Sequence, residues 1–131
     1  MTFMTPLTRD LRGQRILVAE DEGLIALELE MALQSFGCEV LGPVSRVDDV
    51  LSQVEQHQPD GALLDVNLRG RQIFEVLPQL IELRLRLIIT SGYNDDSLFP
   101  PSFRTLPRIA KPFNEAVLLQ ICGRVFAGVS A

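Results

Sequence analysis

The amino-acid sequence predicts one α/β domain in which a doubly wound, five-stranded parallel sheet is covered by helices on both faces. Five short aliphatic runs alternate with longer amphipathic stretches along the 131 residues, and this alternation is typical of a parallel sheet. The aliphatic runs are continuous, as expected for strands that are buried on both faces. The composition, 47% hydrophobic and 22% charged, is that of a folded domain and argues against disorder.

The first elements follow from the spacing of apolar residues and turn residues. The run QRILVA at Gln14–Ala19 predicts the first strand. Apolar residues then recur at helical spacing through Glu22–Phe36, and Gly37 suits the end of that helix. A second strand over Cys38–Gly42 is expected to stop at Pro43.

The next helix is predicted to open with a capping box, because Ser45 and Asp48 have the required spacing. The apolar residues of this helix share one inward face: Val47, Val50, Leu51 and Val54. Pro59 is expected to end the helix, and the run DGALLD at Asp60–Asp65 predicts the third strand.

A third helix is predicted over Arg71–Leu83, with Phe74, Leu77 and Ile81 on one face. Because a proline inside a helix removes a backbone donor, Pro78 is expected to kink this helix or to restart it. The fourth strand follows at Leu85–Thr90, the fifth at Leu106–Ala110, and the last helix at Asn114–Val125. This last helix has one apolar stripe, which consists of Leu118, Ile121, Cys122 and Val125.

Between the fourth and fifth strands, the segment Gly92–Thr105 lies where a fourth helix is expected. The pair Pro100-Pro101 cannot lie inside a helix, so this helix is predicted to be degenerate. The natural strand order for the whole alternation is 2-1-3-4-5. In such sheets a ligand crevice lies outside the carboxyl ends of strands 1 and 3.

Charge and cysteine content argue against several classes of protein. The net charge is −5 and the 12 basic residues are scattered, which argues against binding of nucleic acid. No apolar run is long enough to span a membrane, and the N-terminus lacks the pattern of a signal peptide. Cys38, Cys122 and the single histidine, His57, have no partners at metal-ligand spacing. We therefore expect a cytoplasmic protein with reduced, packed thiols and no membrane insertion.

Five polar residues follow the predicted strands at their carboxyl ends. Glu20 and Asp21 come after the first strand, Asp65 ends the third, Ser91 follows the fourth and Lys111 follows the fifth. Because these strand ends meet at one edge of the sheet, the five side chains are expected to converge in the crevice. The three carboxylates would repel one another unless a cation joined them, and such oxygen ligands suit Mg²⁺.

Transfer of a phosphoryl group onto Asp65 accounts for this arrangement. A carboxylate can attack phosphorus and form an aspartyl phosphate, and most of the catalysis lies in stabilising charge on the equatorial oxygens. Mg²⁺ held by Asp21 and Asp65 would take one oxygen, the ammonium of Lys111 a second, and the hydroxyl of Ser91 a third. The backbone carbonyl of Asn67, two residues beyond Asp65, can complete the metal shell.

At these positions the chain resembles the receiver domains of response regulators in two-component signalling. Four signature segments occur in the right order at strand ends: Ile16–Glu22, Leu63–Leu68, Ile89–Gly92 and Lys111–Phe113. The resemblance covers residues 13–128, which leaves 1–12 as an N-terminal extension and 129–131 as a tail. It implies a flavodoxin-like receiver fold, Mg²⁺-dependent phosphorylation of Asp65, and only slow self-catalysed dephosphorylation. It also implies that the donor is a histidine kinase or a histidine phosphotransfer protein.

The chain departs from the family pattern at three places. Arg108 stands three residues before Lys111, where receivers usually carry an aromatic switch residue. The stretch Arg69–Arg71 (RGR) replaces the Pro-Gly pair that usually follows the phosphoacceptor. Tyr93 follows Ser91 by two positions, and together with the Pro-rich segment this resembles a subgroup called FAT GUY receivers. Tyr93 and Arg108 are therefore both candidates for the switch.

Output is expected through protein–protein contact, because no effector domain follows the last helix. The alternatives are that the chain is a phosphate sink, a relay intermediate or a receiver cut from a longer chain. The predicted output surface comprises residues 93–108 and the last helix, where Leu98, Phe99 and Phe103 flank the two prolines in a segment of low local stability. The alternative is that these three side chains fill the core in place of the fourth helix. The downstream partner and a homodimer remain open.

Three other functions fit these residues less well. A phosphatase with an aspartyl nucleophile typically carries a second Asp two residues later, where this chain has Asn67. A flavin or nucleotide binder would place phosphate against the acidic loop Glu20–Glu22, which repels it. A phosphorylation-independent adaptor is disfavoured because the acidic pair, Asp65 and Lys111 are all present. Taken singly, Ser91 could be a turn residue and Lys111 a solvated lysine.

Overall fold

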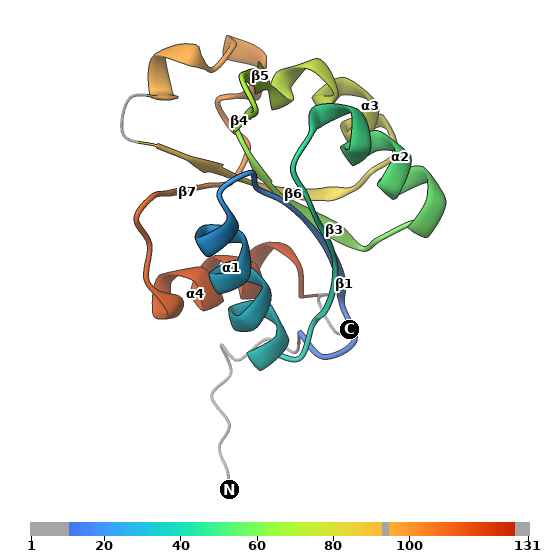
Figure 1. Cartoon of the computed structure of the whole chain (residues 1–131), viewed down its shortest axis with the longest axis vertical. Helices are drawn as coiled ribbons and strands as arrows, with labels where there is room; N and C mark the ends of the chain where they lie inside the picture. The colour runs from blue at the N-terminus through green and yellow to red at the C-terminus, as the bar shows by residue number, and fades with distance from the viewer. Residues whose placement is uncertain (1–10, 93–94, 128–131) are drawn as a thin grey trace, which may run out of the picture.

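A five-stranded parallel sheet forms the centre of the computed structural model, which describes residues 11–92 and 95–127 (Figure 1). The strands are β1 Arg15–Ala19, β2 Glu39–Val44, β3 Gly61–Asp65, β6 Arg86–Ser91 and β7 Arg108–Ala110. They lie in the order β2-β1-β3-β6-β7, and every neighbouring pair is parallel. This is the predicted order 2-1-3-4-5, so the doubly wound α/β fold is confirmed.

Helices cover both faces of the sheet (Figure 1). The helices are α1 Gly23–Ser35, α2 Val47–His57, α3 Leu77–Glu82 and α4 Glu115–Val125. Helices α1 and α4 lie on one face, and α2 and α3 lie on the other. Because successive side chains of a strand point to opposite faces, each central strand supplies two cores. The core under α1 and α4 includes Ile16, Leu63 and Ile88, and the other core includes Leu17, Leu64 and Ile89.

Strand β2 continues to Val44, although the sequence predicts that it ends before Pro43. Its pairing with β1 shifts register near this point. Gly42 has φ +86°, and an added Cβ there would lie 2.9 Å from the Val18 carbonyl oxygen, so a glycine permits the irregularity. Pro43 is tolerated because β2 is an edge strand. The extension lets the Glu20 N–H donate to the Val44 carbonyl at 2.9 Å.

Helix α2 begins without the predicted capping box. Arg46 is its N-cap residue, and no side chain forms a capping hydrogen bond there. Ser45 Oγ instead accepts a hydrogen bond from Arg69 Nε at 3.3 Å, and Asp48 forms an ion pair with Arg71 at 2.8 Å. The two residues of the expected box are therefore held by arginines that follow β3. The inward face is as predicted, with Val47, Val50 and Val54 buried.

The stretch predicted as one helix over Arg71–Leu83 divides into shorter elements. A two-stranded hairpin and a 3₁₀ helix precede α3: β4 Asn67–Leu68, β5 Arg71–Gln72 and η1 Ile73–Glu75. Pro78 lies in the first turn of α3, where its missing N–H is not needed, so it restarts a helix and does not kink one. Leu80 faces the core where Ile81 was predicted, and Ile81 is 43% exposed.

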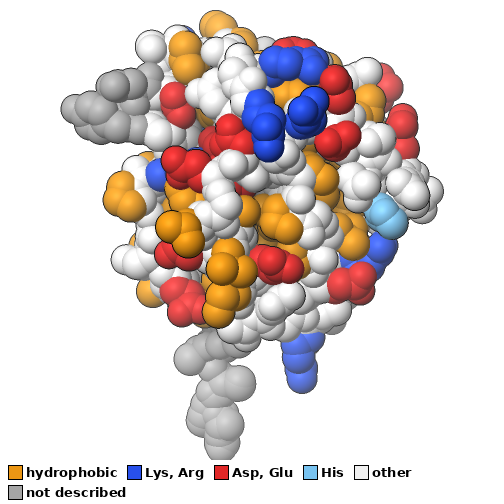
Figure 2. All heavy atoms as spheres, viewed as in Figure 1, with side chains coloured by type: hydrophobic (Ala, Val, Ile, Leu, Met, Phe, Trp, Pro, Cys, Tyr) orange, Lys and Arg blue, Asp and Glu red, His pale blue; other side chains and the backbone are white. Residues whose placement is uncertain are grey.

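The β4–β5 hairpin carries basic side chains to the edge of the sheet. Arg69 and Gly70 form its turn with φ +50° and +83°. Arg71 pairs with Asp48 and, at 2.6 Å, with Glu75. Arg46, Arg69 and Arg71 line a hollow of about 240 Å³, and Figure 2 shows Lys and Arg side chains gathered among carboxylates over this part of the surface.

The segment between β6 and β7 contains no α-helix in its described residues, as predicted. Two 3₁₀ helices take its place, η2 Asp95–Leu98 and η3 Pro101–Phe103. Phe99 is 1% exposed and meets the Phe74 ring edge-on with 5.0 Å between centroids, and Phe103 stacks on Phe74 at 6.0 Å. Phe99 and the half-buried Phe103 thus fill the core in place of a fourth helix. Leu98 is 40% exposed.

Leu11 and Ala127, the first and last described residues, both belong to the core under α1 and α4. Helix α4 is capped by Asn114, whose side chain accepts the Val117 N–H at 2.8 Å. Cys38 and Cys122 are buried free thiols, and burial raises the pKa of Cys38 to about 11 and that of Cys122 to about 12. Within residues 11–92 and 95–127, no helix has the length and apolar character needed to cross a bilayer.

Candidate functional site

The five polar residues predicted to converge all lie at the carboxyl edge of the sheet. Glu20 and Asp21 directly follow β1, and Asp65 is the last residue of β3. Ser91 is the last residue of β6, and Lys111 is the first residue after β7. The parallel topology therefore brings segments that are up to about ninety positions apart in the sequence to one place.

Lys111 is the cation of this group. Its Nζ lies 2.8 Å from Glu20 Oε1 and 3.0 Å from Asp65 Oδ2. The side chains of Glu20 and Asp65 are 0% and 8% exposed, and that of Lys111 is 18% exposed. Because water screens these charges little, the ion pairs hold Lys111 over the end of β3. The Lys111 N–H also donates to the Ser91 carbonyl at 2.8 Å, which ties the lysine to the end of β6.

Burial and neighbouring charges alter the proton affinity of both partners. Burial raises the pKa of Asp65 to about 6, because the hydrogen bond from Lys111 lowers it less than burial and the Glu20 charge raise it. Burial alone would lower the pKa of Lys111, but its contacts with Glu20 and Asp65 outweigh this effect and raise the pKa. At neutral pH the Asp65 carboxylate is therefore ionised, and its buried charge destabilises the fold. A second cation nearby would stabilise this charge.

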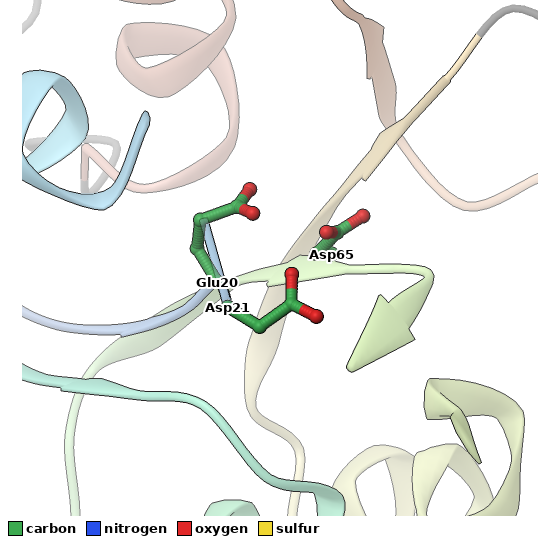
Figure 3. A group of neighbouring side chains, drawn as sticks. All are labelled: Glu20, Asp21 and Asp65. Atoms are coloured by element: carbon green, nitrogen blue, oxygen red, sulfur yellow. The ribbon is translucent and has the colours of Figure 1, made fainter. Parts of the chain in front are cut away.

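Three carboxylates form a group that can hold a metal ion. One oxygen each from Glu20, Asp21 and Asp65 lie within 4.8 Å of one another. Figure 3 shows Glu20 and Asp21 extending from the loop after β1 beside Asp65. With Lys111 included, three negative charges face one positive charge. All donors are hard oxygens and a net negative charge remains, so this group fits a hard divalent cation such as Mg²⁺.

Backbone amides hold two of these carboxylates in place. The Glu22 N–H donates to Glu20 Oε2 at 3.0 Å, and the Arg69 N–H donates to Asp21 Oδ2 at 2.9 Å. The second contact links the acidic loop to the β4–β5 hairpin. Asn67, whose carbonyl is the expected fourth ligand, begins β4 of the same hairpin.

A second hydroxyl, which the sequence analysis did not select, lies nearer to Asp65 in the sheet register. Thr90 pairs directly with Asp65, whereas Ser91 is one residue further along β6. Alternation places Thr90 on the face of Ile88 and Leu63, which is also the face of Asp65, and turns Ser91 to the opposite face. Thr90 Oγ1 is fully buried and has no hydrogen-bond partner among the described residues. The sequence alone does not separate Thr90 from Ser91, because the two are adjacent and the choice depends on the register between β3 and β6.

The predicted switch and output residues do not lie in one place. Arg108 lies over the Phe99 ring with 4.4 Å from its guanidinium carbon to the ring centroid, a cation–π contact that covers the buried ring. Phe99 and Phe103 belong to the core, and Leu98 is the exposed member of the apolar trio. Tyr93 lies outside the described residues.

Comparison with solved structures identifies the family of proteins that shares this fold. SdrG from Sphingomonas melonis Fr1 is 34% identical, with a TM-score of 0.74 over 83% of this chain and 92% of that chain. The response regulator PhyR from Brucella abortus is 25% identical, with a TM-score of 0.78 over 92% of this chain and 50% of that chain. The signal receiver domain of a modulated diguanylate cyclase from Desulfovibrio desulfuricans G20 is 26% identical, with a TM-score of 0.77 over 87% of this chain and 94% of that chain. The chain is a response-regulator receiver domain.

The assignment of this chain to the receiver family rests on the fold and on matches that cover most of the chain. No family model matches the sequence. The chain spans less than half the length of the curated relatives it matches, which are bacterial transcriptional regulatory and sensory transduction proteins. The predicted family and fold are therefore confirmed, and a role in two-component signalling follows from them.

Proposed function

We propose that this receiver accepts a phosphoryl group on Asp65 from a histidine kinase or a histidine phosphotransfer protein. The observation that carries the proposal is the position of Asp65. It lies at the end of β3 between Lys111, at 3.0 Å, and the acidic pair Glu20 and Asp21. A nucleophile with a cation on one side and a group suited to a second cation on the other is arranged for phosphoryl transfer.

Each residue then has a defined part in the transfer. An Asp65 oxygen attacks phosphorus as the bond from phosphorus to the donor's imidazole nitrogen breaks, and that nitrogen regains a proton. Lys111 neutralises charge on one equatorial oxygen, because its ammonium already lies at the nucleophile. Glu20, Asp21, Asp65 and the Asn67 carbonyl would hold Mg²⁺, which supplies positive charge to a further oxygen when bound.

A hydroxyl is proposed to contact the remaining phosphoryl oxygen. Ser91 was the candidate from the sequence, but the register favours Thr90, which pairs with Asp65 and carries a buried hydroxyl without a partner among the described residues. Such an unsatisfied group is costly, and a phosphoryl oxygen on Asp65 would satisfy it. Comparing Thr90→Val with Ser91→Ala, by the lifetime of the phosphorylated form, decides between the two residues.

Output is proposed to pass through protein–protein contact in the cytoplasm, with slow self-catalysed dephosphorylation and no other enzymatic activity. For this chain we propose that the downstream partner recognises the surface around η2, η3 and α4. The membership of the FAT GUY subgroup is likewise a proposal, supported by the two 3₁₀ helices in place of a fourth α-helix.

The test is phosphorylation by acetyl phosphate followed by intact-mass measurement. With Mg²⁺ present, the wild-type chain should gain one phosphoryl mass, and chelation of Mg²⁺ should abolish the gain. Asp65→Asn should gain nothing, while Glu75→Gln, a carboxylate on the neighbouring η1, should label like wild type. Labelling of wild type that is independent of Mg²⁺ would contradict the proposed metal chemistry.

A further inference from the structure

The turn of the β4–β5 hairpin is in direct contact with the acidic loop, although nearly fifty positions separate the two in the sequence. The Arg69 backbone N–H donates to Asp21 Oδ2 at 2.9 Å. Asp21 is also the least buried of the three clustered carboxylates, so no surrounding core fixes its side chain as it fixes Glu20 and Asp65. Among the described residues, the Arg69 amide is therefore the contact that fixes the orientation of the Asp21 carboxylate.

The backbone of the turn that carries this amide adopts a conformation unfavourable for an arginine. Arg69 has φ +50°, in the left-handed region that L-residues other than glycine rarely adopt. The next residue, Gly70, takes φ +83°, which glycine adopts readily. Arg69 is additionally held from the other side, because its Nε donates to Ser45 Oγ at 3.3 Å. A strained backbone conformation persists only where surrounding contacts hold it, and here the contacts with Asp21 and Ser45 do so.

We infer that the backbone N–H of Arg69 positions Asp21 for the metal ion, and that the Arg69 side chain is not needed for this. The inference rests on the proposed function, in which Asp21 is a metal ligand. It is particular to this chain, because the receivers it resembles usually carry a Pro-Gly pair after the phosphoacceptor, and a proline has no N–H to donate. Arg69-Gly70 stands in place of that pair.

The chemistry of the contact supports a positioning role. An N–H bound to one carboxylate oxygen fixes the side-chain rotamer. One oxygen of Asp21 is then occupied by the amide, and the other can turn toward Glu20 and Asp65, with which Asp21 shares a 4.8 Å cluster. Hydrogen bonds that orient a metal ligand are typically worth about 10–100-fold in metal affinity.

Three substitutions at one position separate the amide from the side chain. Arg69→Gly and Arg69→Ala keep the N–H and remove the guanidinium, and glycine also relieves the strain of a positive φ. Arg69→Pro removes the N–H, but it also changes the turn, because the proline ring holds φ at about −65° whereas Arg69 has φ +50°. Mg²⁺ affinity is measured by calorimetry on the unphosphorylated chain, with folding checked by circular dichroism.

Arg69→Pro should weaken Mg²⁺ about tenfold, whereas Arg69→Gly and Arg69→Ala should bind Mg²⁺ as tightly as wild type. Equal affinity of the proline variant and wild type would overturn the inference. Loss of affinity in the glycine variant as large as in the proline variant would also overturn it, because the side chain would then carry the effect. Absence of Mg²⁺ binding by wild type would instead contradict the proposed metal chemistry.

A measurement without metal tests the contact itself and does not depend on how the proline variant folds. In ¹⁵N-labelled wild-type protein with chelator, the Arg69 amide should resonate downfield and exchange slowly with solvent. Asp21→Ala should move that resonance upfield and speed its exchange, while Glu22→Ala should leave it in place. An Arg69 amide that does not respond to Asp21→Ala would overturn the inference even if Mg²⁺ binds.

Discussion

Replacing Asp65 with asparagine should stabilise the metal-free fold at neutral pH and leave it nearly unchanged in acid. The pKa of Asp65 is raised by burial from an ordinary 3.8 to about 6, so folding with the ionised carboxylate carries a penalty. When folding raises the pKa of a carboxyl group, the protein has its full stability at pH values below the pKa of the unfolded state. It loses stability as the pH rises toward and through the pKa of the folded state. A difference of about two units corresponds to about 3 kcal/mol.

Urea unfolding of both proteins in chelator, at several pH values from about 4 to 8, measures this penalty. The stability of Asp65→Asn minus that of wild type should rise over the window between pH 4 and pH 6 and then level off near 3 kcal/mol. Mg²⁺ should narrow the difference, because only wild type keeps all three carboxylates that would bind the ion. Glu55→Gln, which neutralises a carboxylate at an exposed position of α2, is the control for the loss of one negative charge.

A difference that stays flat between pH 4 and pH 7 would refute the reasoning, because the stabilisation would then not come from titration of Asp65. A wild-type protein that is more stable than Asp65→Asn at pH 7 without metal would refute it as well. In that case the ion pair with Lys111 would outweigh the cost of burial.

The remaining predictions concern the lysine, the aromatic core and the β2 irregularity. Lys111→Ala removes the cation that lowers the pKa of Asp65, so carboxyl NMR titration should place that pKa above the wild-type value; a lower value would contradict the described ion pair. Phe99→Ala should cost about 3–5 kcal/mol of unfolding free energy, because the ring is 1% exposed. The neighbouring Leu98→Ala, at a 40% exposed side chain, should cost under about 1 kcal/mol, and equal losses would show that Phe99 is not in the core. Gly42→Ala should destabilise by more than about 1 kcal/mol in the same assay, since φ is +86° and the Val18 carbonyl leaves no room for a Cβ; a neutral effect would argue against the described backbone.

Burial on two faces made the sheet predictable. Continuous apolar runs such as Ile16–Ala19 and Ala62–Leu64 are buried throughout, and their order along the chain left one natural topology. The strand ends then brought Glu20, Asp21, Asp65 and Lys111 together, because the position of each depended only on where a strand stops.

Local signals failed where tertiary contacts compete with them. Ser45 and Asp48 have capping-box spacing, but Arg69 and Arg71 bind both side chains, and these arginines come from a hairpin that helical periodicity concealed. Gly42 and Pro43 usually signal the end of a strand, and here they mark an irregularity inside an edge strand.

The choice between the two hydroxyls needed the register. Thr90 and Ser91 are adjacent in the sequence, and only the pairing of Asp65 with Thr90 shows which of them shares the face of Asp65. The contact between Arg69 and Asp21 was equally invisible, because a backbone amide leaves no signal in the residue type.

Chemical trapping of the phosphorylated residue tests the central claim most directly. Wild-type protein is phosphorylated with acetyl phosphate and Mg²⁺ and then reduced with borohydride, which converts an aspartyl phosphate to homoserine. Peptide mass spectrometry should find homoserine at position 65 and unmodified Glu20 and Asp21. Homoserine at another aspartate, with Asp65 intact, would contradict the account.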